Sequence, residues 1–422
     1  MLDEARGASA RGQSPPRRVA VTGLGAVSGA GWGVAALWSA LREGRTTLGP
    51  FSRFDHTRHR THLAGQVPDG PDSPPWPRGF ARLSFSERFA VFAAREAVAQ
   101  AGLAAPLPEG PTGVFFGTST GGLLESEWYL DRLWQQGGTR ADLHLMAGHQ
   151  LNAPGDAVAR DLRVTGPVET ISSACASAAL AIAAALRALR EGEVELAIAG
   201  GSDCLCATTY AGFNSLRSVD ESPCRPFGHD RGGLSLGEGA GVVVLEPLER
   251  ARARGARVRA EILGAGASCD ANHMTAPLES GQGAASALAR ALADAATLPE
   301  RVGYINAHGT GTPLNDAAEW AAYSIAFGER ASRIPVSATK SIVGHLLGSS
   351  GAIEAVATVL CLEAGLAHPA AGHGPVDPGF GVDLVQGEPR RLSGDTVAVS
   401  TSLGFGGANT ALVFALGSPE AA

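Results

Sequence analysis

The sequence predicts an α/β protein in which helices cover both sides of a mainly parallel β-sheet, and three observations lead to this prediction. The chain has 422 residues, of which 45% are hydrophobic, so it can build one large domain or two fused lobes. Segments of strand character alternate with alanine-rich segments of helical length along the whole chain. The 56 glycines indicate many tight turns and close backbone approaches, which argues against a helical bundle.

The first half of the chain opens with a predicted strand at 17–28 that ends in a glycine-rich turn. Apolar runs bounded by small residues predict two further strands at 112–122 and 194–204. The segment 169–192 is predicted as a short strand that runs directly into a long alanine-rich helix. A hairpin-like pair of strands is expected at 232–247, where the first half ends.

The second half repeats this style of strand, small-residue turn and helix. Its predicted strands are 258–269, 302–309, 334–340, 395–407 and 409–416. Its predicted helices are 284–295, 315–327 and 352–365. We therefore expect an N-terminal lobe at 18–255 and a C-terminal lobe at 256–418, each built in the same way. Residues 1–17 are polar, contain Pro and Arg and show no periodicity, which predicts a disordered N-terminal tail.

The composition argues against several classes of protein. A net charge of −7 argues against nucleic-acid binding. The six cysteines contain no CxxC pair and no zinc-type spacing, which predicts free thiols in a cytoplasmic chain. The N-terminus has no apolar run typical of a signal peptide, and every longer apolar stretch is interrupted by Gly, Arg or Glu. We therefore expect a soluble cytoplasmic protein that does not enter a membrane.

Cys175 lies in the run SSACAS, between a predicted strand and the first turn of a predicted helix. A helix N-terminus carries a partial positive charge and free N–H groups, and both favour the thiolate. Because the thiolate is the reactive form of cysteine, this position predicts a nucleophile. The alternative is a small buried apolar cysteine, which is the commoner fate of a thiol.

Two histidines follow predicted strands of the second half. His308 lies in NAHGTGTPLND and His345 lies in TKSIVGHLLGSSG. Because α/β proteins build sites at the carboxyl ends of parallel strands, these histidines and Cys175 form a candidate Cys–His–His set. The alternative for each histidine alone is a hydrogen-bonded core residue.

Two further features point to the same region. Lys340, five residues before His345, is the one lysine among the 34 basic Lys and Arg residues of the chain. Lysine is favoured where the bulk or fixed charge of arginine would not serve, which predicts a functional role, and chance is the alternative. Phe405 lies in the glycine-flanked run GFGGAN, whose backbone can offer an N–H group to an oxyanion. The alternative for GFGGAN is a simple tight turn.

Two rival patterns are weaker. Ser119 lies in a G-x-S-x-G pattern after a predicted strand, which is typical of the nucleophile of a serine hydrolase. His56, His59 and His62 are spaced by three, which on a helix could hold a metal ion, although the intervening arginines favour a solvated loop.

Four motifs taken together resemble a known family. They are SSACAS around Cys175, NAHGTGTPLND around His308, TKSIVGHLLGSSGAIEA around Lys340 and His345, and SLGFGGAN around Phe405. Their order, together with LGEGAG at 236–241, resembles the β-ketoacyl-acyl-carrier-protein synthases, the elongating ketosynthases of type II fatty acid and polyketide assembly. The resemblance covers about 18–416. It implies a thiolase fold with duplicated lobes in a five-layered α-β-α-β-α arrangement, usually dimeric.

The resemblance also implies roles for individual residues. Cys175 would be the nucleophile, completed by His308 and His345, with Lys340 beside them and Glu354 as the partner of the lysine. The N–H groups of Cys175 and Phe405 would form the oxyanion hole, with Phe405 also acting as the gate. Thr310 and Thr312 would contact the phosphopantetheine arm. Thr120, in the segment that lines the acyl pocket, is more polar than the aliphatic residue common in fatty acid enzymes.

The expected function is therefore that of an acyltransferase, a β-ketoacyl-ACP synthase that condenses an acyl chain on Cys175 with malonyl-ACP. Thr120 favours polyketide or polyene synthesis, and fatty acid elongation is the alternative. A serine hydrolase using Ser119 and a non-catalytic partner subunit are the more distant alternatives. The resemblance implies no metal and no cofactor beyond the carrier's phosphopantetheine. The expected partners are acyl carrier protein, docked through arginines such as Arg78 and Arg82, and a second subunit, either a copy or a chain-length-factor-like chain.

Overall fold

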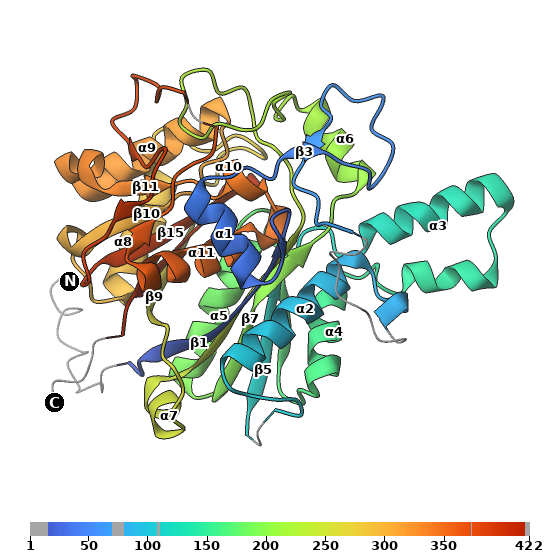
Figure 1. The fold of residues 1–422 in the computed structure, drawn as a ribbon, viewed down its shortest axis with the longest axis horizontal. Coiled ribbons are helices and arrows are strands. Elements are labelled where there is room, and N and C mark those ends of the chain that lie inside the picture. Colours follow the sequence, from blue (N-terminus) through green and yellow to red (C-terminus); the bar gives the residue numbers. More distant parts are fainter. Residues whose placement is uncertain (1–15, 70–79, 108–109, 373, 418–422) are drawn as a thin grey trace, which may run out of the picture.

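The computed structural model describes residues 16–69, 80–107, 110–372 and 374–417 (Figure 1). Most of the tail predicted to be disordered, together with Arg78, lies outside these residues. Arg17, the last residue of that tail, is ordered, because its guanidinium donates to Glu195 at 3.0 Å and to Glu249 at 3.1 Å. The prediction of disorder is therefore wrong for Arg17.

One continuous sheet of 12 strands runs through the described part of the chain. Its strands are β1 (Val19–Ser28), β2 (Gly31–Trp32), β5 (Thr112–Gly117), β6 (Val168–Ile171), β7 (Leu196–Asp203), β8 (Gly239–Pro247), β9 (Ala260–Cys269), β10 (Val302–Asn306), β11 (Pro335–Ser337), β13 (Asp383–Leu384), β15 (Val397–Gly404) and β16 (Ala408–Ala415). Two small separate pairs are β3 (Gly49–Pro50) with β4 (Leu63–Ala64), and β12 (Leu366–Ala367) with β14 (Arg390–Arg391).

The pairing of the strands repeats between the two halves. The first half has the order β1-β8-β7-β5-β6, and the second half has the order β9-β16-β15-β10-β11. In both, the first two pairings are antiparallel and the last two are parallel. The halves join where β1 and β9 pair in antiparallel fashion. The sheet is therefore a mixed one.

This pairing corrects two predictions. The sheet is not mainly parallel, because β8 and β16 run against both of their neighbours, and strand direction cannot be read from strand–helix alternation. The hairpin expected at 232–247 is also wrong. Only β8 is a strand there, and the residues before it pair elsewhere, because Leu234 donates to the carbonyl of Ser218 and Gly237 donates to that of His345.

The α-helices of the described chain are α1 (Val34–Glu43), α2 (Phe85–Gln100), α3 (Leu123–Gln136), α4 (Ala153–Leu162), α5 (Ser177–Glu191), α6 (Ala207–Ser215), α7 (Leu248–Ala253), α8 (Gln282–Asp294), α9 (Pro313–Phe327), α10 (Lys340–Val343) and α11 (Ser350–Ala364). Short 3₁₀ segments are Phe80–Arg82, Arg140–Met146, Pro299–Arg301, Gly328–Arg333, Leu347–Ser349 and Phe405–Gly407.

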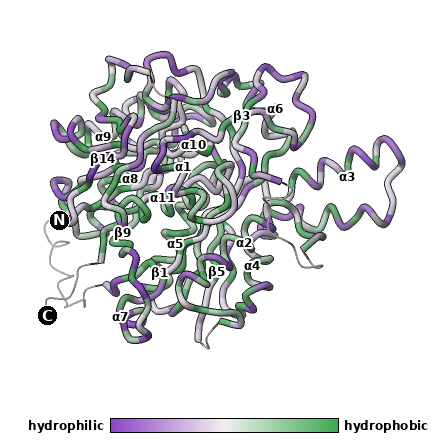
Figure 2. Tube along the Cα trace, in the orientation of Figure 1, coloured by the Kyte–Doolittle hydropathy of each residue, from purple (hydrophilic) through white to green (hydrophobic). Residues whose placement is uncertain are grey.

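Each half of the sheet forms one layer, and the helices form three more, one between the two halves and one on each outer face. Helices α5 and α11 pack against each other and against strands of both halves (Figure 1). Helices α2 and α4 cover the outer face of the first half, and α8 covers that of the second half with α9 packed on it. Figure 2 shows hydrophobic residues concentrated around α5 in the middle of the molecule. The predicted five-layered α-β-α-β-α thiolase fold is thus confirmed.

Helix α11 is apolar because it is a core helix. The stretch Leu347–Ala364 is the one helical stretch of the described residues that is long and apolar enough to cross a membrane, but 89% of it is buried inside the protein. The position of α11 explains its apolar composition, because the helix is packed between the strands of the two halves.

Helix α3 and the 3₁₀ segment Arg140–Met146 form an arm that projects from the body (Figure 1). Large apolar side chains are exposed on this arm. Trp134 is 87% exposed, and Leu130, Leu133 and Leu143 are between 42% and 52% exposed. The sequence did not predict this arm, which leaves an apolar surface in the single chain.

Candidate active site

A cavity of about 290 Å³ lies at the ends of elements from both halves of the fold. Six of the residues singled out in the sequence line it, namely Cys175, His308, Thr310, Thr312, His345 and Phe405. Lys340 and Glu354 lie beside His308 in the protein interior. The structure therefore brings together the predicted Cys–His–His set and its predicted supports.

Cys175 lies two residues before α5, as predicted, in a tightly built loop. Ala174 has a positive φ of 46°, a conformation that costs free energy for a residue with a Cβ. The β15 end approaches so closely that a Cβ on Gly404 would lie 3.3 Å from the Cys175 nitrogen and 3.1 Å from the Ser173 oxygen. Glycine at 404 therefore allows the phenylalanine loop to reach the sulfur.

The thiol of Cys175 is buried, and burial raises its pKa to about 11. The charge of Lys340 and the backbone N–H of Phe405 lower the pKa, but less than burial raises it. The motif alone did not predict this direction of the pKa, because it depends on how deeply the packed loops bury the sulfur.

This pKa gives a first testable prediction. Between pH 7 and pH 9, the rate of alkylation of Cys175 by iodoacetamide should rise about tenfold per pH unit, because only the thiolate reacts. The rate is followed by mass spectrometry of the peptide that contains Cys175. Exposed Cys269 serves as the internal control in the same digest. A rate independent of pH in this range would mean that the thiol is already ionised.

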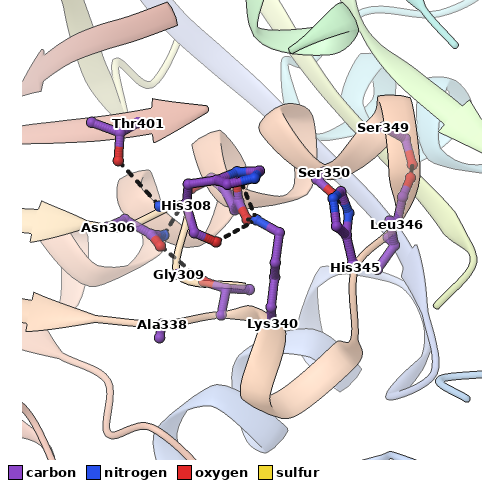
Figure 3. Close-up of polar contacts among 12 residues, drawn as sticks. Asn306, His308, Gly309, Ala338, Lys340, His345, Leu346, Ser349, Ser350 and Thr401 are labelled. Carbon is purple, nitrogen blue, oxygen red and sulfur yellow. Dashed lines mark hydrogen bonds and ion pairs between the residues drawn. The ribbon is translucent and has the colours of Figure 1, made fainter. Parts of the chain in front are cut away.

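The buried ammonium of Lys340 contacts the imidazole of His308 at its Nδ1 atom (Figure 3). The Nζ atom lies 3.1 Å from His308 Nδ1, donates to the His308 carbonyl at 2.6 Å, and pairs with Glu354. These three contacts use the three donors of an ammonium group. Nδ1 of His308 is therefore an acceptor, and the proton of the neutral ring is on Nε2.

Neutral hydrogen-bond donors hold His345 in the same tautomer as His308, with the proton on Nε2. The backbone N–H of Leu347 donates to His345 Nδ1 at 3.1 Å, and Ser350 Oγ lies 2.8 Å from the same atom. A backbone N–H can only donate, so Nδ1 is an acceptor and the proton is on Nε2.

Both imidazoles are neutral in the ordinary pH range. Burial, reinforced by the charge of Lys340, holds the pKa of His308 and of His345 well below the usual value. The two rings lie 5.5 Å apart between centroids at 88° to each other. The cavity is therefore lined by two neutral imidazoles that carry their proton on Nε2.

Buried carboxylates that the sequence analysis missed fix the loops around the cavity. Glu319 accepts from the backbone N–H of His308 at 2.7 Å, from that of Gly309 at 2.8 Å, and from Tyr323 and Thr401. The signal was present, because two acidic residues spaced by three, Asp316 and Glu319, lie on an otherwise apolar helix.

Asp203 explains the serine motif. Its carboxylate accepts from Thr118, from the backbone and hydroxyl of Ser119, from the backbone and hydroxyl of Thr120, and from the Ser349 N–H. In the described structure no histidine is among the hydrogen-bond partners of Ser119. This favours the interpretation of the motif as a turn that binds the Asp203 carboxylate over that of a hydrolase nucleophile. The hydroxyl of Thr120 donates to Asp203, and Thr120 does not line the 290 Å³ cavity. The structure therefore does not place Thr120 beside the other predicted site residues.

The histidines at 56, 59 and 62 are held by other contacts. His56 and His62 lie 2.9 Å apart between their Nδ1 atoms, and the ring of His59 packs against Tyr210. Among the residues that the structure describes, no group of three His, Cys, Asp or Glu side chains is arranged to hold a metal ion.

Comparison with known proteins agrees with this geometry. The family model "Beta-ketoacyl synthase, N-terminal domain" matches residues 16–251, and "Beta-ketoacyl synthase, C-terminal domain" matches 259–373. The 3-oxoacyl-[acyl-carrier-protein] synthase 2 of Synechocystis sp. is 40% identical over 94% of this chain and 98% of its own length.

Two solved structures share the fold over nearly the whole chain. The ishigamide ketosynthase/chain length factor is 35% identical with a TM-score of 0.89, covering 96% of this chain and all of that one. A ketosynthase bound to a type II PKS acyl-carrier protein is 28% identical with a TM-score of 0.87, covering 95% of this chain and all of that one.

A duplicated fold that places a helix-start cysteine and two imidazoles around one cavity defines an acyl-transferring condensing enzyme of the thiolase class. The two family models extend over most of the chain, and the relative from Synechocystis sp. is similar over nearly the whole chain. The chain belongs to the β-ketoacyl synthase family.

Proposed function

We propose that Cys175 carries the acyl chain and that His308 and His345 assist its decarboxylative condensation with malonyl-ACP. The observation that supports this assignment most strongly is that both imidazoles are neutral and hold their proton on Nε2, within one cavity that Cys175 also lines. A general base would need a free ring nitrogen on that side, whereas a pair of donors suits a substrate that develops negative charge.

In the first step the sulfur of Cys175 attacks the thioester carbonyl of an acyl carrier. The new carbon–sulfur bond forms, the carrier sulfur leaves, and the thiol proton passes from one sulfur to the other. The backbone N–H groups of Cys175 and Phe405 stabilise the tetrahedral oxyanion, and loss of one such donor typically costs about 2.7–4 kcal/mol. The Phe405 loop also gates the cavity in this proposal.

In the second step malonyl-ACP loses carbon dioxide, and the electron pair of the broken bond becomes an enolate. The enolate oxygen takes hydrogen bonds from Nε2 of His308 and of His345. The enolate carbon then attacks the acyl carbonyl on Cys175, and the sulfur leaves as a thiolate that takes one proton from solvent. Lys340 and Glu354 hold His308 in the donor tautomer.

The carrier delivers both substrates on its phosphopantetheine arm, and the proposed chemistry needs no other cofactor. Thr310 and Thr312 line the cavity with their hydroxyls 2.9 Å apart, where they can contact the amides of the arm. Arg217 lines this cavity and also a second one, which Arg58 and Arg60 share. This group of arginines suits an acidic carrier better than the predicted Arg82, which lines neither cavity.

A second subunit is expected to cover the exposed apolar arm at α3. The relatives described above include a ketosynthase solved with its chain length factor, so the partner is either a copy of this chain or a chain-length-factor-like subunit. We propose that the enzyme works in the cytoplasm, in type II polyketide or polyene synthesis. Fatty acid elongation is the second candidate pathway, favoured by the similarity to 3-oxoacyl-ACP synthase 2.

The test separates loading from condensation. Wild-type enzyme incubated with an acyl-ACP should show the acyl mass on the peptide that contains Cys175. His345→Ala should keep this loading within a few-fold but lose condensation with malonyl-ACP by about 10²–10³, because one of the two enolate donors is gone. Ser119→Ala is the control, and it should retain both steps. Acyl mass on the Ser119 peptide would instead support a hydrolase. A chain that stays inactive with every partner subunit supplied would contradict the proposal.

A further inference from the structure

Ser350 lies where it can control the orientation of one imidazole (Figure 3). It is the first residue of α11, it is 1% exposed, and its Oγ atom lies 2.8 Å from Nδ1 of His345. Since the Leu347 N–H already makes Nδ1 an acceptor, the hydroxyl of Ser350 must be the donor in this contact. Two donors thus converge on a single ring nitrogen.

The two imidazoles differ in how they are held. Nδ1 of His308 faces a charged ammonium, whereas Nδ1 of His345 faces only a backbone N–H and a hydroxyl in the described structure. Leu347 offers its N–H from a left-handed conformation with φ of 53°, which is unfavourable for leucine. In the described structure, the hydroxyl of Ser350 is thus the one side-chain donor to Nδ1 of His345, where it reinforces the backbone N–H of Leu347.

We propose that Ser350 is a positioning residue for condensation, because its hydroxyl, together with the Leu347 N–H, keeps the proton of His345 on Nε2 and aims this N–H into the cavity. The inference rests on the proposed function, in which Nε2 of His345 donates to the enolate. A donor at Nδ1 also disfavours protonation of the ring, because a protonated ring has no lone pair there. The titratable and charged groups around this ring are Lys340, His308 and Cys175.

The neighbouring residue supplies a matched control. Ser349 is equally buried and adjoins Ser350, but its hydroxyl donates to the carbonyl of Leu346 at 2.7 Å and has no contact with an imidazole. Replacement of either serine by alanine removes one buried hydroxyl at the start of the same helix. Only the replacement of Ser350 changes the hydrogen bonds of His345.

The experiment compares Ser350→Ala and Ser349→Ala in the full-length enzyme, with wild-type condensation measured first. For Ser350→Ala, we expect acyl loading of Cys175 to stay within about twofold. The kcat of condensation should fall about tenfold, which is the change in rate expected from the loss of one hydrogen bond. KM for malonyl-ACP should change little, and the acid limb of the pH profile should move to higher pH. Ser349→Ala should leave kcat and the pH profile unchanged within about twofold.

Equal losses in the two variants, or an unchanged pH profile in Ser350→Ala, would overturn the positioning role. Thermal unfolding of both variants checks that each is folded, and a common loss of stability would point to packing alone. Failure of the proposed function is distinguishable, because then the wild-type enzyme itself would not condense the two thioesters.

Discussion

Cys175→Ala should load no acyl chain and should lose condensation by at least about 10⁴-fold, because the removal of a covalent nucleophile leaves no route through the acyl-enzyme. The same variant should still release carbon dioxide from malonyl-ACP. In the proposed mechanism, that step needs the donors of His308 and His345 but not the sulfur. Intact-mass spectrometry measures loading, and the release of carbon dioxide is measured separately.

Cys361→Ala is the matched control for this experiment. Cys361 is also buried, and burial raises its pKa to about 11, but it contacts Tyr304 and does not line the cavity. It should load and condense at rates near those of the wild type. Acyl mass on Cys175→Ala would show that another residue is the nucleophile.

Lys340→Met should destabilise the folded protein by about 3–5 kcal/mol, because it leaves the buried carboxylate of Glu354 without its cation. Burial already raises the pKa of Glu354 to about 7 although Lys340 lowers it, so protonation of the carboxyl limits this cost. Condensation should also fall, because Nδ1 of His308 loses the donor that fixes its tautomer. Urea unfolding gives the free energy of unfolding.

Two further variants test whether the loss of stability in Lys340→Met comes from the unpaired buried charge. Lys340→Met combined with Glu354→Met should recover most of the lost stability, since both charges then leave the interior. Arg187→Met removes an exposed ion pair with Glu191 and should cost less than about 0.5 kcal/mol. If Lys340→Met cost as little as Arg187→Met, the buried contacts of the ammonium would not be stabilising.

The sequence predicts the elements of this fold better than it predicts their directions. Most predicted strands and helices are present within a few residues, because hydrophobic runs and alanine-rich segments set local structure. The antiparallel course of β8 and β16 was missed, since pairing depends on contacts far apart in the chain. The arm at α3 was missed for a related reason, because its large apolar side chains are exposed and are not covered by other described residues.

The site was predictable in its chemical groups but not in its electrostatics. The motifs around Cys175, His308 and His345 indicated the three groups, and the structure brings them to one cavity. The raised pKa of the Cys175 thiol was not predictable, because the degree of burial is a property of the packed loops and not of the motif. The hydrogen bond from the Thr120 hydroxyl to Asp203 was not predictable from the motif, because the two residues lie far apart in the sequence.

The repeated strand order makes α5 and α11 counterparts, since each follows the outer parallel strands of its half and precedes the next inner one. Cys175 stands just before α5, and His345 stands just before α11. Each half of the repeated fold therefore supplies one reactive group, a sulfur or an imidazole, from the loop that leads into its own central helix. A change in the packing of α5 against α11 would shift the sulfur and the imidazole relative to each other.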